Sequence, residues 1–179
     1  LPWMLIEKQR GEYHWEEIDA VFEHASSASL NLLPVVYGIP EWAAIDGCGP
    51  ISDTQALNDF LTAVLNRYSA DVDVWEFINE PDGLEPQDNY GPIIGCWGPY
   101  PEEYANQLGI FHTKVQALDP GARVVYGGLA YDSWDYFSRE FLTNTLQHGA
   151  GQFFNVANIH YYPINYQHPD PDLYPTLGH

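Results

Sequence analysis

The sequence predicts an α/β fold with a parallel sheet, from the order and character of its apolar segments. Four short β-rich runs begin near residues 32, 72, 122 and 153, and amphipathic helical segments precede and separate them. Strands that alternate with helices in this way are typical of right-handed βα units. A doubly wound open sheet and a (β/α)8 barrel both fit this order. No G-x-G-x-x-G motif follows a strand, which disfavours the nucleotide-binding version.

Length and composition predict one core-forming domain with an acidic surface. The chain has 179 residues, 45% of them hydrophobic, and its 25 acidic and 6 basic side chains give a formal charge of −19. A domain typically has roughly 100–200 residues. The negative charge and the lack of a basic cluster argue against nucleic-acid binding. The longest apolar run, Trp3–Ile6, is far shorter than the roughly 20 residues of a membrane span.

The first half of the chain contains two predicted helices around one strand. Apolar residues recur at helical spacing from Trp15 to Ala25. The compact apolar run Leu32–Tyr37 predicts a buried strand. Ser52, with Gln55 three residues later, resembles a capping box and is expected to begin a helix that continues to Tyr68.

The second half repeats this alternation. The segment 72–78 predicts a strand, and the helix from Pro101 to Leu118 has Glu102 and Glu103 at its positive end. A strand is expected over 123–126, a less regular helix over 134–146 and a last strand over 153–162. Residues 163–179 are expected to form a proline-rich loop or tail.

The two cysteines lie in Gly/Pro-rich loops, and their spacing matches no metal motif. Cys48 and Cys96 could form one disulfide, which would favour a secreted or extracellular protein, or they could both be free thiols. The histidines show no H-E-x-x-H or similar spacing, so no metal or other cofactor is expected.

The segment Val74–Pro81 holds the residues best suited to chemistry. Alternation along a strand places Glu76, Ile78 and Glu80 on one face. Glu80 comes at the carboxyl end of the strand, where parallel α/β folds assemble their active sites. Glu76 lies deeper and is expected to be a buried structural residue, paired with an arginine.

At this segment the sequence resembles a known group. Trp75–Pro81, with its Asn-Glu-Pro ending, is similar to the fourth-strand signature of the retaining glycoside hydrolases of clan A. The sequence around it is most similar to family 39, the β-xylosidase and α-L-iduronidase relatives. Three further stretches resemble the same barrels in the same order, and these are 6–15, 33–43 and 159–162. The resemblance implies part of a (β/α)8 barrel, from about strand 2 or 3 to strand 6, and predicts no further strand after Tyr162.

The resemblance also implies roles for single residues. Glu80 would be the general acid/base, and Asn79 would hydrogen-bond the sugar 2-hydroxyl. His160 and Tyr162 would line the floor of the sugar site. Trp42 and Trp97 would be platforms that stack on a pyranose ring. A retaining mechanism also needs a second carboxylate about 5–5.5 Å from the first.

In clan members that second carboxylate ends the seventh strand, so the nucleophile is expected outside this chain. A complete barrel has about 250 residues. The 179 residues are therefore expected to be a single partial catalytic domain of a larger enzyme that binds carbohydrate and contains the remainder of the barrel. The alternative is a non-catalytic carbohydrate-binding or structural half-barrel that self-associates or packs within an assembly.

Overall fold

The computed structural model describes residues 1–45, 48–85, 94–130 and 136–160. In this part of the chain four strands form one sheet, namely β1 (Val35–Val36), β2 (Val74–Phe77), β3 (Arg123–Leu129) and β4 (Val156–Ile159). The strands lie in chain order, and each pairs in parallel with the next. Consecutive parallel strands with helical connections confirm the predicted α/β class.

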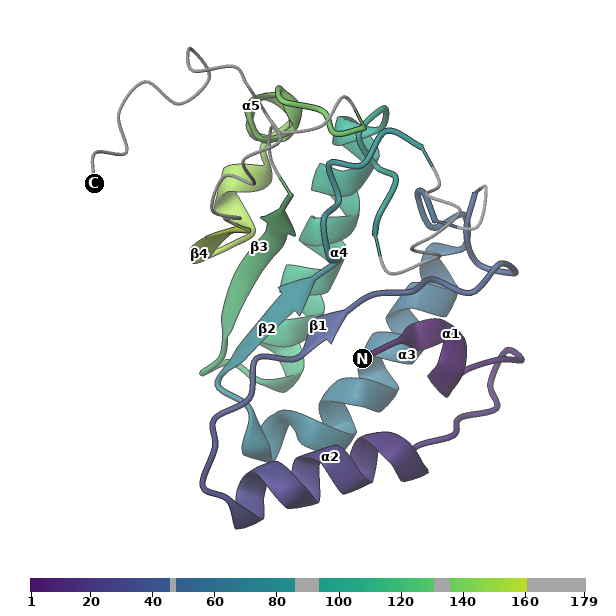
Figure 1. Cartoon of the computed structure of the whole chain (residues 1–179), viewed down its shortest axis with the longest axis vertical. Helices are drawn as coiled ribbons and strands as arrows, with labels where there is room; N and C mark the ends of the chain where they lie inside the picture. The colour runs from purple at the N-terminus through teal and green to yellow at the C-terminus, as the bar shows by residue number, and fades with distance from the viewer. Residues whose placement is uncertain (46–47, 86–93, 131–135, 161–179) are drawn as a thin grey trace, which may run out of the picture.

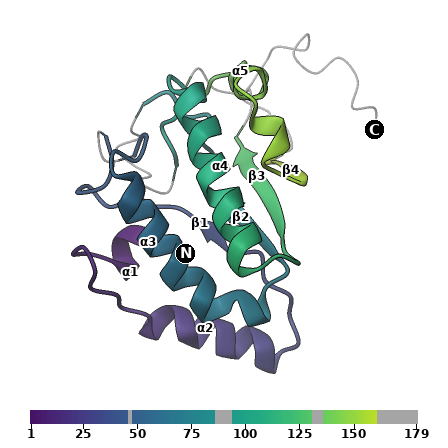
Figure 2. The same cartoon turned by 180° about the vertical axis from the view of Figure 1, so that it is seen from behind.

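Two of the five described helices, α3 (Thr54–Tyr68) and α4 (Pro101–Leu118), cover one face of this sheet. The others are α1 (Trp3–Ile6), α2 (Glu16–Ser27) and α5 (Phe141–Gln147), with short 3₁₀ turns η1 (Ser69–Asp71) and η3 (Ala150–Gln152). Helices α3 and α4 lie behind the sheet in Figure 1 and in front of it in Figure 2, and neither view shows a described helix across the opposite face. No described helix is both long enough and apolar enough to cross a bilayer.

The first residues of the chain extend the sheet beyond β1. The Leu1 amine donates to the Val35 carbonyl (2.6 Å), and the Tyr37 amide donates to the Leu1 carbonyl (3.1 Å). Pro2 and Tyr37 form a parallel bridge. Leu1 and Pro2 therefore lie alongside β1 as a short parallel neighbour, before the chain turns into the short helix α1, which the sequence did not indicate.

The helix predicted from Pro101 to Leu118 is α4, with the same bounds. Other predicted boundaries change. The first strand is only Val35–Val36 rather than Leu32–Tyr37. The helix predicted over 134–146 is α5, which begins at Phe141, and residues 136–140 precede it as turn and bridge. The last strand begins at Val156 rather than at residue 153. Residues 161–179, which include the predicted proline-rich tail, lie outside the described part.

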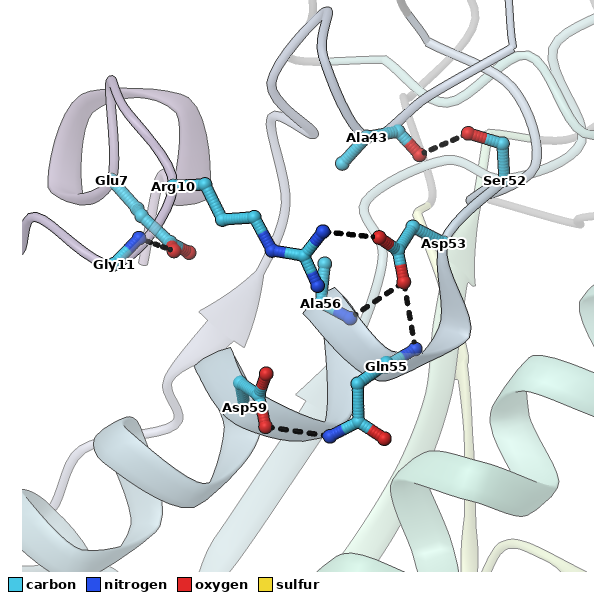
Figure 3. Close-up of polar contacts among 9 residues, drawn as sticks. All are labelled: Glu7, Arg10, Gly11, Ala43, Ser52, Asp53, Gln55, Ala56 and Asp59. Carbon is cyan, nitrogen blue, oxygen red and sulfur yellow. Dashed lines mark hydrogen bonds and ion pairs between the residues drawn. The ribbon is translucent and has the colours of Figure 1, made fainter.

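The start of α3 differs from the predicted capping box, because Asp53 is the cap. The Asp53 carboxylate accepts from the Gln55 and Ala56 amides, both at 3.0 Å, and Arg10 donates to it at 2.7 Å (Figure 3). Ser52 instead donates to the Ala43 carbonyl. The Ala56 amide and the Arg10 charge keep the pKa of Asp53 below its ordinary value.

The core lies between the sheet and helices α3 and α4. Trp75 and Phe77 of β2 point toward the helices and are fully buried. Phe77 stacks on Phe111 of α4 with ring centroids 5.0 Å apart. Tyr104, one turn into α4, packs edge-on against Tyr126 of β3 at 5.1 Å. This aromatic layer fixes the depth at which β2 and β3 lie above α4.

The two cysteines form a disulfide, with an S–S distance of 1.98 Å. Cys48 belongs to the connection that follows β1, and Cys96 belongs to the connection that follows β2. The Cys96 amide also donates to the Cys48 carbonyl at 3.3 Å. The bond therefore joins two loops that leave the same edge of the sheet, the edge at which Glu80 lies.

Candidate active site

Glu80 lies at the carboxyl edge of the sheet, three residues beyond the end of β2. Only 7% of its surface is exposed. Ile78 and Glu80 both adopt left-handed backbone conformations, with φ of 65° and 47°. A β-branched residue at positive φ is a real outlier, and surrounding structure must hold it there. The turn also ends the strand alternation that the sequence predicted, because a left-handed residue does not continue an extended strand and β2 ends at Phe77.

His160, directly after β4, meets Glu80. The His160 Nδ1 atom lies 2.9 Å from Glu80 Oε1. The backbone at both residues is hydrogen-bonded to β3, which lies between β2 and β4. The Glu80 amide donates to the Gly128 carbonyl (3.0 Å), and the His160 amide donates to the Leu129 carbonyl (2.8 Å). Either Nδ1–H donates to the carboxylate or a protonated Glu80 donates to Nδ1, so one proton is shared along this contact.

Glu76 of β2 is the second buried carboxylate, with 1% of its surface exposed. Its Oε1 accepts from the Gly128 amide at 2.8 Å, and both of its oxygens lie 3.1 Å from the Asn158 side-chain nitrogen. The expected arginine partner is therefore wrong for the described residues, where Glu76 forms no ion pair. Amide donors on β3 and β4 satisfy this carboxylate instead.

The glycine pair of β3 makes room for this arrangement. A Cβ atom on Gly127 would lie 2.4 Å from the Ile78 carbonyl oxygen, and one on Gly128 would lie 2.3 Å from His160 Nε2. Tyr104 reaches the same point from α4, where its hydroxyl donates to the Phe77 carbonyl (3.1 Å) and accepts from the Gly127 amide (3.0 Å). Complete burial raises the pKa of Tyr104 well above its ordinary value.

The other predicted site residues have different surroundings. Asn79 is half-buried between the two left-handed residues, and its carbonyl accepts from the Gly95 amide at 2.9 Å. Trp42 is half-buried beyond β1, and its ring nitrogen donates to the Glu7 carbonyl at 3.3 Å. Tyr162 lies outside the described residues.

The structure corrects the prediction that Trp97 is a stacking platform. None of its surface is exposed. Its ring packs edge-on against Tyr104 at 5.6 Å and against Phe77 at 6.2 Å, and its ring nitrogen has no hydrogen-bond partner. A stacking platform needs an open face, so Trp97 belongs to the core under the site.

Sequence reasoning missed three residues of this site. Asn158 lies two residues before His160, so the period of a strand already places both on one face. Gly128 is one of two glycines inside a β-rich run, which is typical of close backbone approach. Asp82 is buried after β2, and its carboxylate accepts from the Ala130 amide at 3.1 Å. The described residues contain no group of three His, Cys, Asp or Glu side chains placed to hold a metal ion.

Comparison with known proteins places this geometry in context. No protein-family model matches the chain. The endo-1,4-beta-xylanase 1 of Gibberella zeae is 25% identical over 136 residues, which cover 70% of this chain and 35% of that protein.

Among solved structures, a psychrophilic endo-beta-1,4-xylanase of glycoside hydrolase family 10 has a TM-score of 0.62 at 17% identity, over 87% of this chain and 52% of that one. A family 39 β-xylosidase from Caulobacter crescentus has a TM-score of 0.56 at 19% identity, over 88% of this chain and 36% of that one. The chain folds as part of a (β/α)8 barrel. It spans between about a third and a half of the length of these relatives.

The neighbours are glycoside hydrolases of more than one family. They include the family 10 and family 39 enzymes and the catalytic domain of a family 30 xylanase from Talaromyces cellulolyticus, which has a TM-score of 0.59 at 14% identity, over 84% of this chain and 38% of that one. The likeness therefore extends across glycoside hydrolases as a group and does not single out family 39. In such barrels the carboxyl edge of the strands carries the active site, and Glu80 and His160 lie at this edge.

Proposed function

We propose that this chain carries the acid/base part of a retaining glycoside hydrolase active site, with Glu80 as the general acid/base. The observation that carries the proposal is the contact between a nearly buried Glu80 and His160 at the carboxyl edge of a parallel sheet. A carboxyl group there can give a proton to a leaving glycosidic oxygen and then take one from water. The contact with His160 holds the carboxyl group in one orientation during both steps.

The nucleophile would come from sequence outside these 179 residues. Retention requires it about 5–5.5 Å from Glu80, on the other side of the scissile bond. The face of the sheet opposite α3 and α4 carries Glu76 and Asn158 and is the inner side of the barrel. The remaining strands would close around this side and bring the second carboxylate to the same edge.

The proposed substrate is a β-linked oligo- or polysaccharide or a β-glycoside, because the names of the xylanase and xylosidase relatives specify β-linkages. Asn79 would bind the sugar 2-hydroxyl, and His160 and Tyr162 would lie under the ring. Trp42, half-buried beyond β1, is the aromatic candidate for stacking that keeps part of its surface exposed.

The test is Glu80→Ala in the full-length protein, assayed on aryl β-xylosides, β-glucosides and β-galactosides with good and poor leaving groups. Loss of the acid should reduce kcat most for poor leaving groups, by about 10²–10⁴-fold. Glu41→Ala is the matched control, because Glu41 is an exposed glutamate that follows β1. The first-formed anomer, observed by proton NMR, tests retention.

Two results would contradict the proposal. An equal small loss on all leaving groups would show that Glu80 is not the acid. Carbohydrate binding without turnover in the wild-type full-length protein would favour the alternative, a non-catalytic binding half-barrel.

A further inference from the structure

Glu76 and Asn158 form a contact that the proposed reaction does not itself require. Glu76 lies four residues before Glu80, and Asn158 lies two residues before His160. The carboxylate of Glu76 holds the Asn158 amide at 3.1 Å, and the carboxylate of Glu80 holds the His160 ring at 2.9 Å. Glu76 in β2 therefore contacts Asn158 in β4, and Glu80 after β2 contacts His160 after β4. Both contacts cross β3.

Gly128 of β3 connects these two contacts. Its amide donates to Glu76 (2.8 Å) and its carbonyl accepts from the Glu80 amide (3.0 Å). A Cβ atom at this position would lie 2.3 Å from His160 Nε2 and 2.8 Å from the Asn158 side-chain nitrogen. Glu76 thus orients the peptide group before Gly128 through the Gly128 amide. The position of Gly128 in turn sets how close the His160 ring can come.

Burying Glu76 is costly unless donors satisfy its oxygens. Three donor contacts do so, and the described residues include no basic side chain within ion-pair distance of it. An apolar side chain of similar volume is often as stabilising as a buried charge. A carboxylate differs here from an apolar side chain because it accepts from both Gly128 and Asn158 and so fixes the orientation of these two groups.

We propose that Glu76 and Asn158 are positioning residues that orient the Glu80–His160 pair through Gly128. This inference rests on the proposed function of Glu80. Neither residue exchanges a proton with the substrate. A misplacement of about 1 Å at a reacting group can cost roughly 10²-fold in rate, so loss of the contact is expected to lower kcat by about 10–100-fold and to leave KM nearly unchanged.

The test exchanges the two partners in the full-length protein. Glu76→Gln puts an amide nitrogen in place of Oε2, where it faces the Asn158 nitrogen. Asn158→Asp sets one carboxylate against another. The double variant Glu76→Gln/Asn158→Asp restores one amide and one carboxylate, and the glutamine oxygen still accepts from Gly128. Each single variant should lose kcat on poor leaving groups, and the double variant should recover most of that loss.

A second readout does not need turnover. The ring signals of His160 in NMR should shift in each single variant and return toward wild type in the double variant. Asp119→Asn is the control. Asp119, at the end of α4, accepts from the ring nitrogen of Trp75 (3.1 Å), and Trp75 precedes Glu76 in β2 and faces the helices. If a single variant does not fold, Asn158→Ala removes the donor without adding a charge and tests the same contact.

The outcomes separate the two proposals. If Glu80→Ala abolishes turnover but both single variants match Asp119→Asn in kcat and in the His160 signals, the positioning role is overturned. If Glu80→Ala leaves turnover unchanged, the proposed function fails. The His160 signals then still show whether Glu76 and Asn158 orient that ring.

Discussion

Replacing Gly128 by alanine is the most direct perturbation of the site. The added Cβ would lie 2.3 Å from His160 Nε2, whereas ordinary contacts begin near 3.4 Å, so the imidazole must retreat by about 1 Å. That movement pulls Nδ1 away from its 2.9 Å contact with Glu80. The atoms in the way belong to the His160 and Asn158 side chains, which can move, so we expect a folded protein with a displaced site.

The expected loss in kcat is about 10²-fold, the rate cost of misplacing a reacting group by about 1 Å. Overpacking should lower the free energy of unfolding by about 1–3 kcal/mol. The assay measures kcat on good and poor leaving groups together with the NMR ring signals of His160. Gly121→Ala is the control, since a Cβ there meets nothing within 4 Å. A Gly128→Ala protein with wild-type kcat and wild-type His160 signals would refute this reasoning.

Four further predictions concern the structure around the site. Gly127→Ala should prevent folding, because its Cβ would lie 2.4 and 2.6 Å from main-chain oxygens that cannot move aside, and circular dichroism would detect this. Tyr104→Phe leaves the buried Gly127 amide without its acceptor and should cost about 1–3 kcal/mol in urea unfolding, while equal stability would contradict that role. Replacing Cys48 and Cys96 by serine removes a link between residues 48 apart and should cost about 4 kcal/mol on the loop-entropy model, and an unchanged urea midpoint would refute that estimate. Stabilisation by the Asp53 carboxylate is complete above the pKa of an unfolded aspartate and is lost as pH falls through the lower pKa of the folded state. Asp53→Asn should therefore weaken the dependence of the free energy of unfolding on pH at acid pH, whereas Asp53→Ala should also lower this free energy at neutral pH because the cap is lost.

Much of the fold could be predicted because it depends on local patterns. The α4 helix follows from Pro101, the two glutamates after it and a regular apolar stripe, and the structure gives it the same bounds. The start of α3 was harder, because Ser52 and Asp53 are both good caps. The structure distinguishes them, because the Asp53 carboxylate accepts from the Gln55 and Ala56 amides while the Ser52 hydroxyl donates to the distant Ala43 carbonyl.

The candidate site was predictable only in part. Glu80 and His160 each follow a strand, and parallel strands bring their carboxyl ends to one edge, so their common edge follows from chain order. Their contact across β3 did not follow from the sequence. The partner of Glu76 did not follow, because a buried carboxylate in a sequence suggests a basic partner and amide donors on adjacent strands leave no such signal. Trp97 was misplaced for a similar reason, since a loop tryptophan shows no periodicity that separates a buried ring from an exposed one.

The sequence by itself determined the alternation of strands and helices, because local patterns set each element. Helical connections between consecutive strands then favour parallel pairing and place Glu80 at the carboxyl edge of the sheet. The tertiary structure alone decided the left-handed turn at Ile78, the bonding of Glu76 to Gly128 and Asn158, and the burial of Trp97. These features depend on distances between strands and on how α4 packs beneath them. Such distances are set only when separate parts of the chain meet.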